Sequence, residues 1–230
     1  MSLTISSFVF LFGTIVSLFL GYRGYKTTKR VGTTLSRDFM FVGLCFFIFS
    51  LITTIGSTFF ANNSIFLKGV VIQATFLQSL SMAFLAHFLF QVKFPKISPW
   101  VGFFIVLILG IINTLWTALS SFSPALEGAA INWHYPVFPT LLRAIILLGI
   151  LLPVFTIFVQ QGLRASSINI RKKAFAFSLL FILSIFTVFL EFFLGEKLGT
   201  REKYGDVSMI FVYLGVLILF FFSSESENKF

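Results

Sequence analysis

Seven long apolar runs, separated by short polar connections, constrain this chain more than any other feature of its sequence. A helix that crosses a bilayer needs about 20 mostly apolar residues, because lipid offers the backbone no hydrogen-bond partners. We therefore expect an all-α membrane protein, a seven-transmembrane-helix bundle that forms a single domain over residues 1–230. Strand alternation is absent, which excludes a transmembrane β-barrel. The predicted spans are 3–21, 38–60, 68–92, 100–120, 137–160, 174–195 and 207–222.

Few charged residues accompany these apolar runs. Charged types make up 11% of the chain, whereas a soluble domain usually carries about 25%. So few charges cannot cover a water-facing surface, which excludes a soluble globular domain, a disordered chain and a disulfide scaffold. The single cysteine, Cys45, cannot form an intramolecular disulfide. The first apolar run has no basic region before it, so we expect a retained helix rather than a cleaved signal peptide.

The positions of lysine and arginine predict the orientation of the bundle. The first, third and fifth connections and the C-terminal tail carry twelve of the 17 basic residues, and the other connections carry four. Cytoplasmic loops are enriched in Lys and Arg, so we expect the N-terminus outside and the C-terminus inside, in the cytoplasmic membrane of a prokaryote. The net charge of +9 then belongs to the cytoplasmic face. It indicates contact with membrane lipids through their anionic headgroups, and not with nucleic acid.

Polar side chains inside the predicted spans concentrate in the outer halves of those spans. Polar groups are costly in lipid, so their positions are the best guide to a functional site. The inner halves are nearly pure Leu, Ile, Val and Phe, with His87 as the main exception. We therefore predict an outward-facing polar cavity that binds a small ligand. The predicted ligand-binding residues are Gln73, Gln78, Asn113, Trp116, Arg143, Glu191 and Tyr213.

Several of these residues also have a purely structural explanation. The amides of Gln73, Gln78 and Asn113 can hydrogen-bond one another, because an unpaired amide in lipid costs several kcal/mol. Arg143 and Glu191 fall at similar depth, so they can form an ion pair, or Arg143 can extend to the outer headgroups. In a ligand site, Arg143 would attract an anionic group and Glu191 would orient Arg143.

Two further features have alternative interpretations. His87, near the inner end of the third span, can titrate near neutral pH or serve as a hydrogen-bonded interfacial histidine. The longest outer connection covers residues 121–136. It predicts either a partial lid over the helix ends or an interfacial loop anchored by Trp133 and Tyr135.

Motifs for catalysis or metal binding are absent from the sequence. There is no HExxH, GxSxG or glycine-rich phosphate loop, and no cluster of acidic residues. Two histidines, His87 and His134, are too few for a multi-histidine metal site or a bis-haem site. We therefore expect no enzymatic activity, no cofactor and no bound metal.

Two short stretches resemble a known family. They are Arg37-Asp38-Phe39-Met40-Phe41, which opens the second span, and Ala86-His87-Phe88-Leu89-Phe90-Gln91-Val92-Lys93-Phe94-Pro95, which closes the third. Together with seven spans and an outside N-terminus, they resemble the seven-helix N-terminal sensor region of bacterial histidine kinases and related signalling proteins. The resemblance covers the whole chain by topology and 15 residues by motif. It implies a bundle that binds a signal and passes it to a cytoplasmic output domain. Only residues 223–230 follow the last predicted span, so signalling would need a separate cytoplasmic partner.

The leading functional hypothesis is therefore a receptor-like or sensor-like protein that takes part in signal transduction. A small three-plus-one-plus-three transporter is an alternative, since the first and last three spans share their orientation around the fourth. Such transporters carry helix-breaking prolines in matching spans, but only Pro153 lies deep in a predicted span. A third hypothesis is a non-catalytic assembly or accessory subunit of a larger membrane complex, in which the 35 Phe residues would build contacts between proteins.

Overall fold

The computed structural model describes residues 4–191 and 201–224, with side chains for 4–191 and 206–219. Seven helices and one two-stranded hairpin make up these residues. The helices are α1 (Ile5–Val31), α2 (Thr34–Phe59), α3 (Ser64–Lys93), α4 (Pro99–Leu119), α5 (Val137–Arg164), α6 (Ile168–Phe189) and α8 (Arg201–Ser224), and the strands are β1 (Ala125–Glu127) and β2 (Ala130–Asn132).

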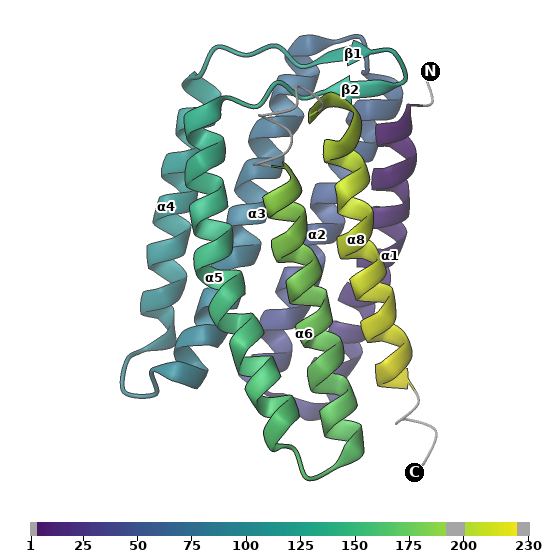
Figure 1. Ribbon diagram of the computed structural model, residues 1–230. Helices are drawn as coiled ribbons and strands as arrows, with labels where there is room; N and C mark the ends of the chain where they lie inside the picture. The colour runs from purple at the N-terminus through teal and green to yellow at the C-terminus, as the bar shows by residue number, and fades with distance from the viewer. Residues whose placement is uncertain (1–3, 192–200, 225–230) are drawn as a thin grey trace.

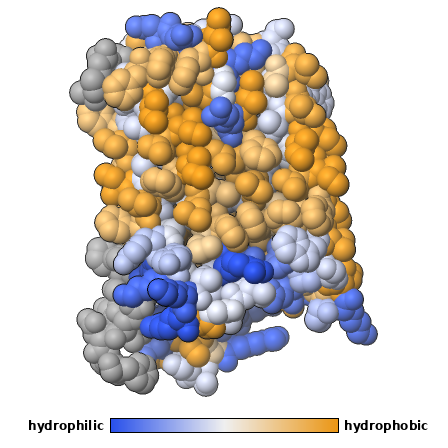
Figure 2. Space-filling view, turned by 180° about the vertical axis from the view of Figure 1, so that it is seen from behind, coloured by the Kyte–Doolittle hydropathy of each residue, from blue (hydrophilic) through white to orange (hydrophobic). Residues whose placement is uncertain are grey.

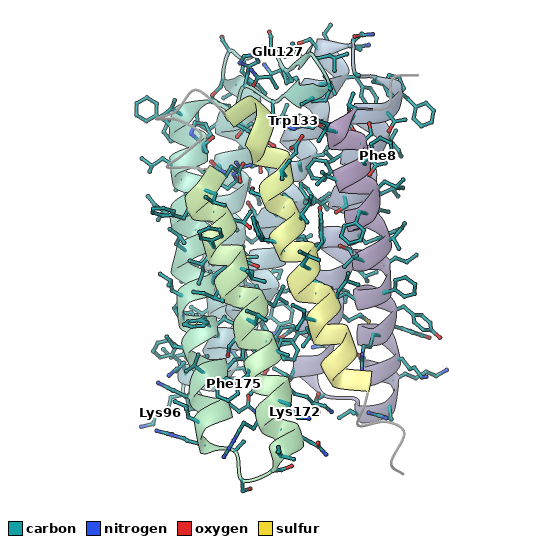
Figure 3. The ribbon with its side chains drawn as sticks, turned by 45° about the vertical axis from the view of Figure 1, so that its right-hand side comes forward. Phe8, Lys96, Glu127, Trp133, Lys172 and Phe175 are labelled. Atoms are coloured by element: carbon teal, nitrogen blue, oxygen red, sulfur yellow. The ribbon has the colours of Figure 1, made fainter. Side chains whose placement is uncertain are left out.

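The helices run side by side along one axis, and the hairpin lies across one end of the bundle (Figure 1). Each helix packs on the next, from α1 through α2 to α3, and then through α5, α6 and α8 back to α1. The remaining helix, α4, packs against α3 and α5. We call the two ends of the bundle the hairpin end and the basic end. Figure 3 shows Glu127 and Trp133 at the hairpin end, and Lys96 and Lys172 at the basic end.

Six helices, α1 to α6, are long and apolar enough to cross a membrane. In α8 the apolar stretch is shorter, Asp206–Leu219. Hydrophobic side chains cover the middle of the outer surface, and hydrophilic side chains gather toward the basic end (Figure 2). The chain is therefore a predominantly helical protein of the multi-pass membrane type, as the apolar runs predict.

The first connection differs from its prediction. Residues 22–37 were expected to link two spans, but α1 continues through the basic segment to Val31, and α2 already begins at Thr34. The break falls at Gly32, whose φ of 69° lies in the left-handed region that glycine adopts without steric cost. The basic residues of this segment therefore lie on helix ends rather than on a flexible loop.

The connection between α4 and α5 forms a β-hairpin, which the sequence pattern did not predict. Its strands pair in antiparallel fashion, with Ala125 opposite Asn132, and the turn contains Gly128 at a φ of 62°. Strands of three residues are too short for an alternation of apolar and polar side chains to be recognised.

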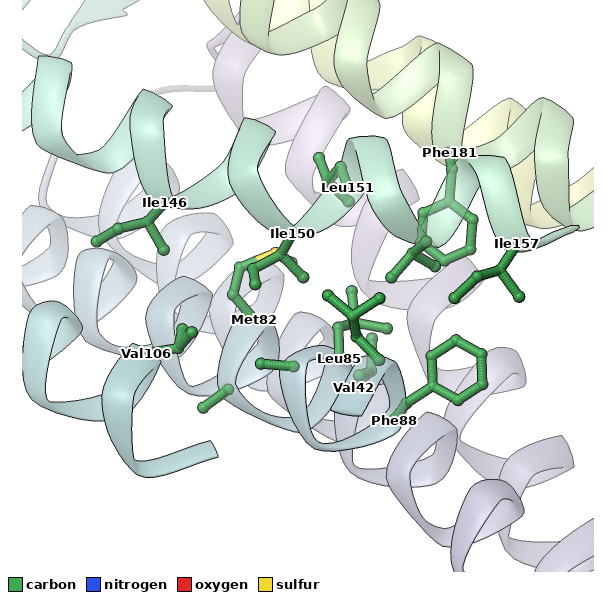
Figure 4. Close-up of a cluster of buried hydrophobic side chains, with 14 of the residues drawn as sticks. Val42, Met82, Leu85, Phe88, Val106, Ile146, Ile150, Leu151, Ile157 and Phe181 are labelled. Atoms are coloured by element: carbon green, nitrogen blue, oxygen red, sulfur yellow. The ribbon is translucent and has the colours of Figure 1, made fainter. Parts of the chain in front are cut away.

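An apolar core fills the middle of the bundle between the two ends. Val42 of α2, Met82 and Leu85 of α3, and Ile150 of α5 are buried there against one another (Figure 4). Toward the basic end the core continues as a cluster of aromatic rings. Those rings are Phe39, Phe88, Phe158, Phe177 and Phe181, with centroids 4.7 to 6.1 Å apart.

Candidate functional site

The hairpin is fastened to the helix ends by specific hydrogen bonds. The Ile5 N–H donates to the Ala129 carbonyl at 2.7 Å, and the Ile131 N–H donates to Ser6 Oγ at 3.0 Å, so the start of α1 holds the turn and the second strand. Because its backbone groups bond to α1, the connection forms an ordered roof over the bundle rather than a loose loop.

Trp133, directly after β2, points from this roof into the bundle. Its indole Nε1–H donates to Asp206 of α8, with distances of 2.9 and 3.2 Å to the two carboxylate oxygens. Its ring meets that of Phe10 edge to face at 6.3 Å. An aromatic ring with a polar N–H suits a position that is apolar on one side and polar on the other. Trp133 thus joins the roof to α1 and α8.

Arg143 of α5 and Glu191, just after α6, form an ion pair beneath the roof. Arg143 Nη2 donates to Glu191 Oε1 at 2.8 Å, and the two side chains are 8% and 24% exposed. The guanidinium also lies over the ring of Tyr135, 4.5 Å from its centroid, in a cation–π arrangement. Of the two structural explanations for Arg143, the ion pair is therefore the one formed in this conformation.

A polar cavity of about 40 Å³ lies among these groups. Two of its lining side chains carry buried polar atoms without a hydrogen-bond partner among the described residues, namely Gln78 Oε1 and Asn132 Nδ2. A buried polar atom without a partner costs about 1–3 kcal/mol, so both atoms favour occupancy by a polar molecule. The lining residues are Phe10, Phe49, Gln78, Asn132, Trp133, His134, Tyr135, Arg143, Glu191, Asp206 and Met209.

Electrostatics at the roof keep Tyr135 neutral. Burial raises the pKa of the Tyr135 phenol to about 12, because desolvation disfavours the phenolate more than the nearby Arg143 favours it. The cavity is thus lined by a guanidinium, two carboxyl groups, two side-chain amides, an indole, an imidazole and a neutral phenol. Such a set can bind a small molecule that both donates and accepts hydrogen bonds.

Three of the seven residues predicted to bind a ligand, Gln78, Arg143 and Glu191, line this cavity. The structure places the other four elsewhere, each in a different setting. Gln73 is exposed on the surface of α3, and Trp116 is 45% exposed and stacks on Phe138 at 6.1 Å. Asn113 and Tyr213, in contrast, are both buried.

Asn113 of α4 is fully buried, and neither its Oδ1 nor its Nδ2 has a hydrogen-bond partner among the described residues. The predicted bonding of Asn113 to the other amides is therefore not formed in this conformation. Tyr213 of α8 is also buried, and its hydroxyl lies 3.2 Å from Ser50 Oγ of α2. Asn113 and Tyr213 occupy contacts between helices and do not line the cavity.

Asn132, Trp133 and Asp206 of α8 also line the cavity, but they are not among the predicted ligand-binding residues. The signal available for the first two was the run of polar and aromatic residues before Pro136, which predicted a lid or an interfacial anchor. The structure confirms that this connection covers the helix ends. Asp206 directly precedes the last predicted span, 207–222, where a carboxylate is ordinary at a membrane boundary.

A second buried polar contact lies toward the basic end. His87 Nδ1 of α3 and Asp38 Oδ2 of α2 are 2.7 Å apart, and both side chains are buried. The His87 ring also meets Trp100 of α4 at 4.8 Å between centroids. His87 is therefore a hydrogen-bonded histidine packed among three helices, as one of its two interpretations expected.

Within residues 4–191 and 201–224, no group of three or more His, Cys, Asp or Glu side chains could hold a metal ion. No protein-family model matches the chain, and no curated protein matches it significantly. The class that the fold and site define is therefore a multi-pass helical membrane protein with a roofed polar cavity at one end.

Proposed function

We propose that this protein is a receptor-like or sensor-like membrane protein that binds a small polar ligand beneath the hairpin. In this proposal it is a seven-span bundle of a prokaryotic cytoplasmic membrane, with the N-terminus and hairpin outside and the basic end in the cytoplasm. The observation that carries the proposal is the cavity in which Arg143, Glu191 and Asp206 meet the unpartnered atoms of Gln78 and Asn132. The gathering of Lys and Arg opposite the hairpin supports the orientation.

The size of the cavity limits the ligand. A volume of about 40 Å³ holds little more than one water molecule. A larger ligand would need the hairpin to lift or the Arg143–Glu191 pair to separate. Ligand binding would therefore be coupled to the position of the roof and to the contact between α5 and the end of α6.

The geometry also suggests a route for transmission. Arg143 lies near the hairpin end of α5, and Glu191 follows α6 at the same end, while the two helices are joined at the basic end by residues 165–167. A ligand that replaces one partner of the ion pair would shift α5 relative to α6. The basic residues around that connection, Arg164, Arg171 and Lys172, would present the shift to a cytoplasmic signalling partner or to anionic headgroups.

A thermal-shift screen tests ligand binding. The purified protein would be heated in detergent with small carboxylates, amines, amino acids and polyols, and its melting temperature followed by tryptophan fluorescence. A ligand that binds only the folded state raises the melting temperature with concentration. Gln78→Ala should abolish that shift, whereas Gln73→Ala, an exposed glutamine on the same helix, should preserve it. The proposal fails if no class shifts the native protein, or if both variants respond alike.

A small transporter is the second candidate, because a larger cavity of about 820 Å³ lies toward the basic end, opposite the polar cavity. Two cavities on opposite sides of one core fit a protein that alternates its access. Uptake of the ligand from the screen into proteoliposomes would favour the transporter, and binding without uptake would favour the receptor. Recovery of the protein only as part of a larger membrane complex would favour an accessory subunit.

A further inference from the structure

The larger cavity has the size of a ligand site rather than that of a packing defect. Its volume is about 820 Å³, within the range of small-molecule and cofactor sites. Six helices, α1, α2, α3, α5, α6 and α8, contribute to its wall. Voids in a protein interior are seldom larger than a water molecule, because the stability lost to an empty space grows with its volume. A cavity of this size therefore requires an occupant, and the side chains that line it select that occupant.

Aliphatic and aromatic side chains make up most of the lining. Four phenyl rings form one group within the wall, with neighbouring centroids 4.7 to 6.1 Å apart. They are the rings of Phe39, Phe88, Phe158 and Phe177. A water molecule inside a protein needs about two to four polar partners. These rings offer none, so this part of the cavity favours hydrocarbon over water.

The length of the cavity matches that of a lipid chain. Along α1 the lining residues extend from Val16 to Val31, which at about 1.5 Å per residue corresponds to about 22 Å. The hydrocarbon core of a bilayer is about 30 Å thick, so one leaflet contributes about 15 Å. The lining therefore spans at least the depth that one chain occupies in the leaflet at the basic end.

Phe19 of α1 connects the cavity with the outer surface of the bundle. It lines the cavity and is 52% exposed. Ile15 and Tyr22, one turn before it and one turn after it, are exposed and do not line the cavity. Phe12, two turns before Phe19 on the same face of the helix, packs edge to face on Tyr213 of α8, with centroids 6.1 Å apart. Phe19 thus lies at the boundary between the outer surface and the cavity, on the side of α1 that faces α8.

We propose that the cavity holds one hydrocarbon chain of a membrane lipid, which reaches it from the bilayer past Phe19. A chain gains no hydrophobic free energy by leaving the bilayer, because both surroundings are hydrocarbon. It gains van der Waals contacts with the four phenyl rings, which an empty cavity would lack. The interaction depends on the chain alone, so lipids with different headgroups bind equally.

Tryptophan fluorescence of the full chain in bilayer nanodiscs tests the proposal. The nanodiscs consist of phosphatidylcholine with dibromostearoyl chains, whose bromine atoms quench an indole that they contact, or of dioleoyl phosphatidylcholine as the reference. Ile157→Trp places a reporter in the cavity wall. Ile146→Trp is the matched control, because Ile146 is another buried isoleucine of α5 but does not line the cavity (Figure 4). We expect bromine to quench the added fluorescence of Ile157→Trp and to leave that of Ile146→Trp unchanged.

Two further measurements separate a lipid chain from other occupants. Phosphatidylglycerol with the same brominated chains should quench Ile157→Trp equally, because only the headgroup differs. Acrylamide, a quencher dissolved in water, should affect Ile157→Trp and Ile146→Trp alike, because neither reporter contacts water. Both variants should elute as the native protein does in size-exclusion chromatography. If Ile157→Trp does not fold, Phe88→Trp gives the same reading from α3, because it replaces one aromatic ring of the cavity wall with another.

Three results would overturn the proposal. Equal bromine quenching of the two isoleucine variants would show that lipid chains do not reach the cavity. Stronger acrylamide quenching of Ile157→Trp would identify a water-filled opening at the basic end. Quenching of Ile157→Trp by the brominated phosphatidylglycerol alone would assign the selectivity to the headgroup rather than to the chain.

Discussion

Asp38 and His87 meet at 2.7 Å, so the two sequence stretches that carry the resemblance to sensor regions are in direct contact. One residue lies in the second turn of α2 and the other near the end of α3. The contact is buried and is packed on Trp100 at the start of α4. The two stretches therefore form a single junction of three helices near the basic end.

Breaking this junction should destabilise the fold. Asp38→Ala leaves the buried imidazole of His87 without its partner, so we expect the free energy of unfolding to fall by about 1–3 kcal/mol. Unfolding in mixed micelles would measure the loss. Arg37→Ala, an exposed neighbour on the same helix, should change stability by less than about 0.5 kcal/mol. Equal effects of the two substitutions would contradict a structural role for the contact.

The Arg143–Glu191 pair should behave as a coupled unit. Glu191→Gln leaves Arg143 in a buried position without a carboxylate, which typically costs about 3–5 kcal/mol for a fully buried pair. Because the Glu191 side chain is 24% exposed, we expect less, about 1–3 kcal/mol. In a double-mutant cycle, the variant Arg143→Met/Glu191→Met should lose less stability than Arg143→Met and Glu191→Met lose together. Purely additive effects would show that the two side chains do not interact.

High pH should weaken the roof through Tyr135. The folded state holds the phenolic proton with a pKa of about 12, against an ordinary value of about 10 in the unfolded chain. The unfolded chain thus loses this proton first, so the Tyr135 contribution is intact below pH 10 and declines as the pH rises toward 12. Absorbance at 295 nm follows the formation of phenolate as the pH rises. It should show transitions well above pH 10, and Tyr135→Phe should remove one of them. A titration unchanged by Tyr135→Phe would refute this assignment.

The link from Trp133 to Asp206 should determine how firmly the hairpin is held. Trp133→Phe preserves an aromatic ring near Phe10 but removes the indole N–H, so a hydrogen bond to a carboxylate worth about 1.5–3 kcal/mol is lost. We expect faster proteolytic cleavage between residues 121 and 136. Trp116→Phe, a half-exposed tryptophan on α4, is the control and should leave cleavage unchanged. Cleavage at the native rate in Trp133→Phe would argue against this anchoring.

Two glycines should respond in opposite directions to alanine. A Cβ on Gly13 would collide with the ring of the buried Tyr213, so Gly13→Ala should cost more than about 2 kcal/mol. A Cβ on Gly149 would meet nothing within 4 Å, so Gly149→Ala should be neutral or add up to about 1 kcal/mol from helix propensity. Thermal unfolding of the two variants side by side would measure the difference. Similar melting temperatures would show that α1 and α8 are not packed as described.

The helices could be predicted because a span must be apolar over a fixed length, and that length is visible in the sequence. The helix ends were harder to predict, because Lys and Arg continue a helix as readily as they form a loop. Only Gly32 marks the end of α1, and a single glycine within a basic segment is a weak signal. The hairpin depends on pairing with α1, which local sequence does not encode.

For the candidate site, the depth of a residue in its span could be predicted from the sequence, but its rotation about the helix axis could not. Gln78, Arg143 and Glu191 lie at the depth of the cavity and also face it. Gln73 and Trp116 are at the hairpin end as well, but point to the surface. A span that is apolar on all sides carries little periodic information about which face is inside, so these cases could not be separated.

The apolar core between the two cavities has an electrical consequence. Three layers follow one another from the hairpin end to the basic end along α2, α3 and α5. They are the polar cavity, the apolar core with Val42, Leu85 and Val154, and the larger cavity. An ion leaving the polar cavity toward the basic end would have to lose its hydration shell, because the aliphatic side chains have no polar group that could replace the water. In this conformation the aliphatic layer formed by the described residues of α2, α3 and α5 therefore opposes the passage of a hydrated ion between the two cavities.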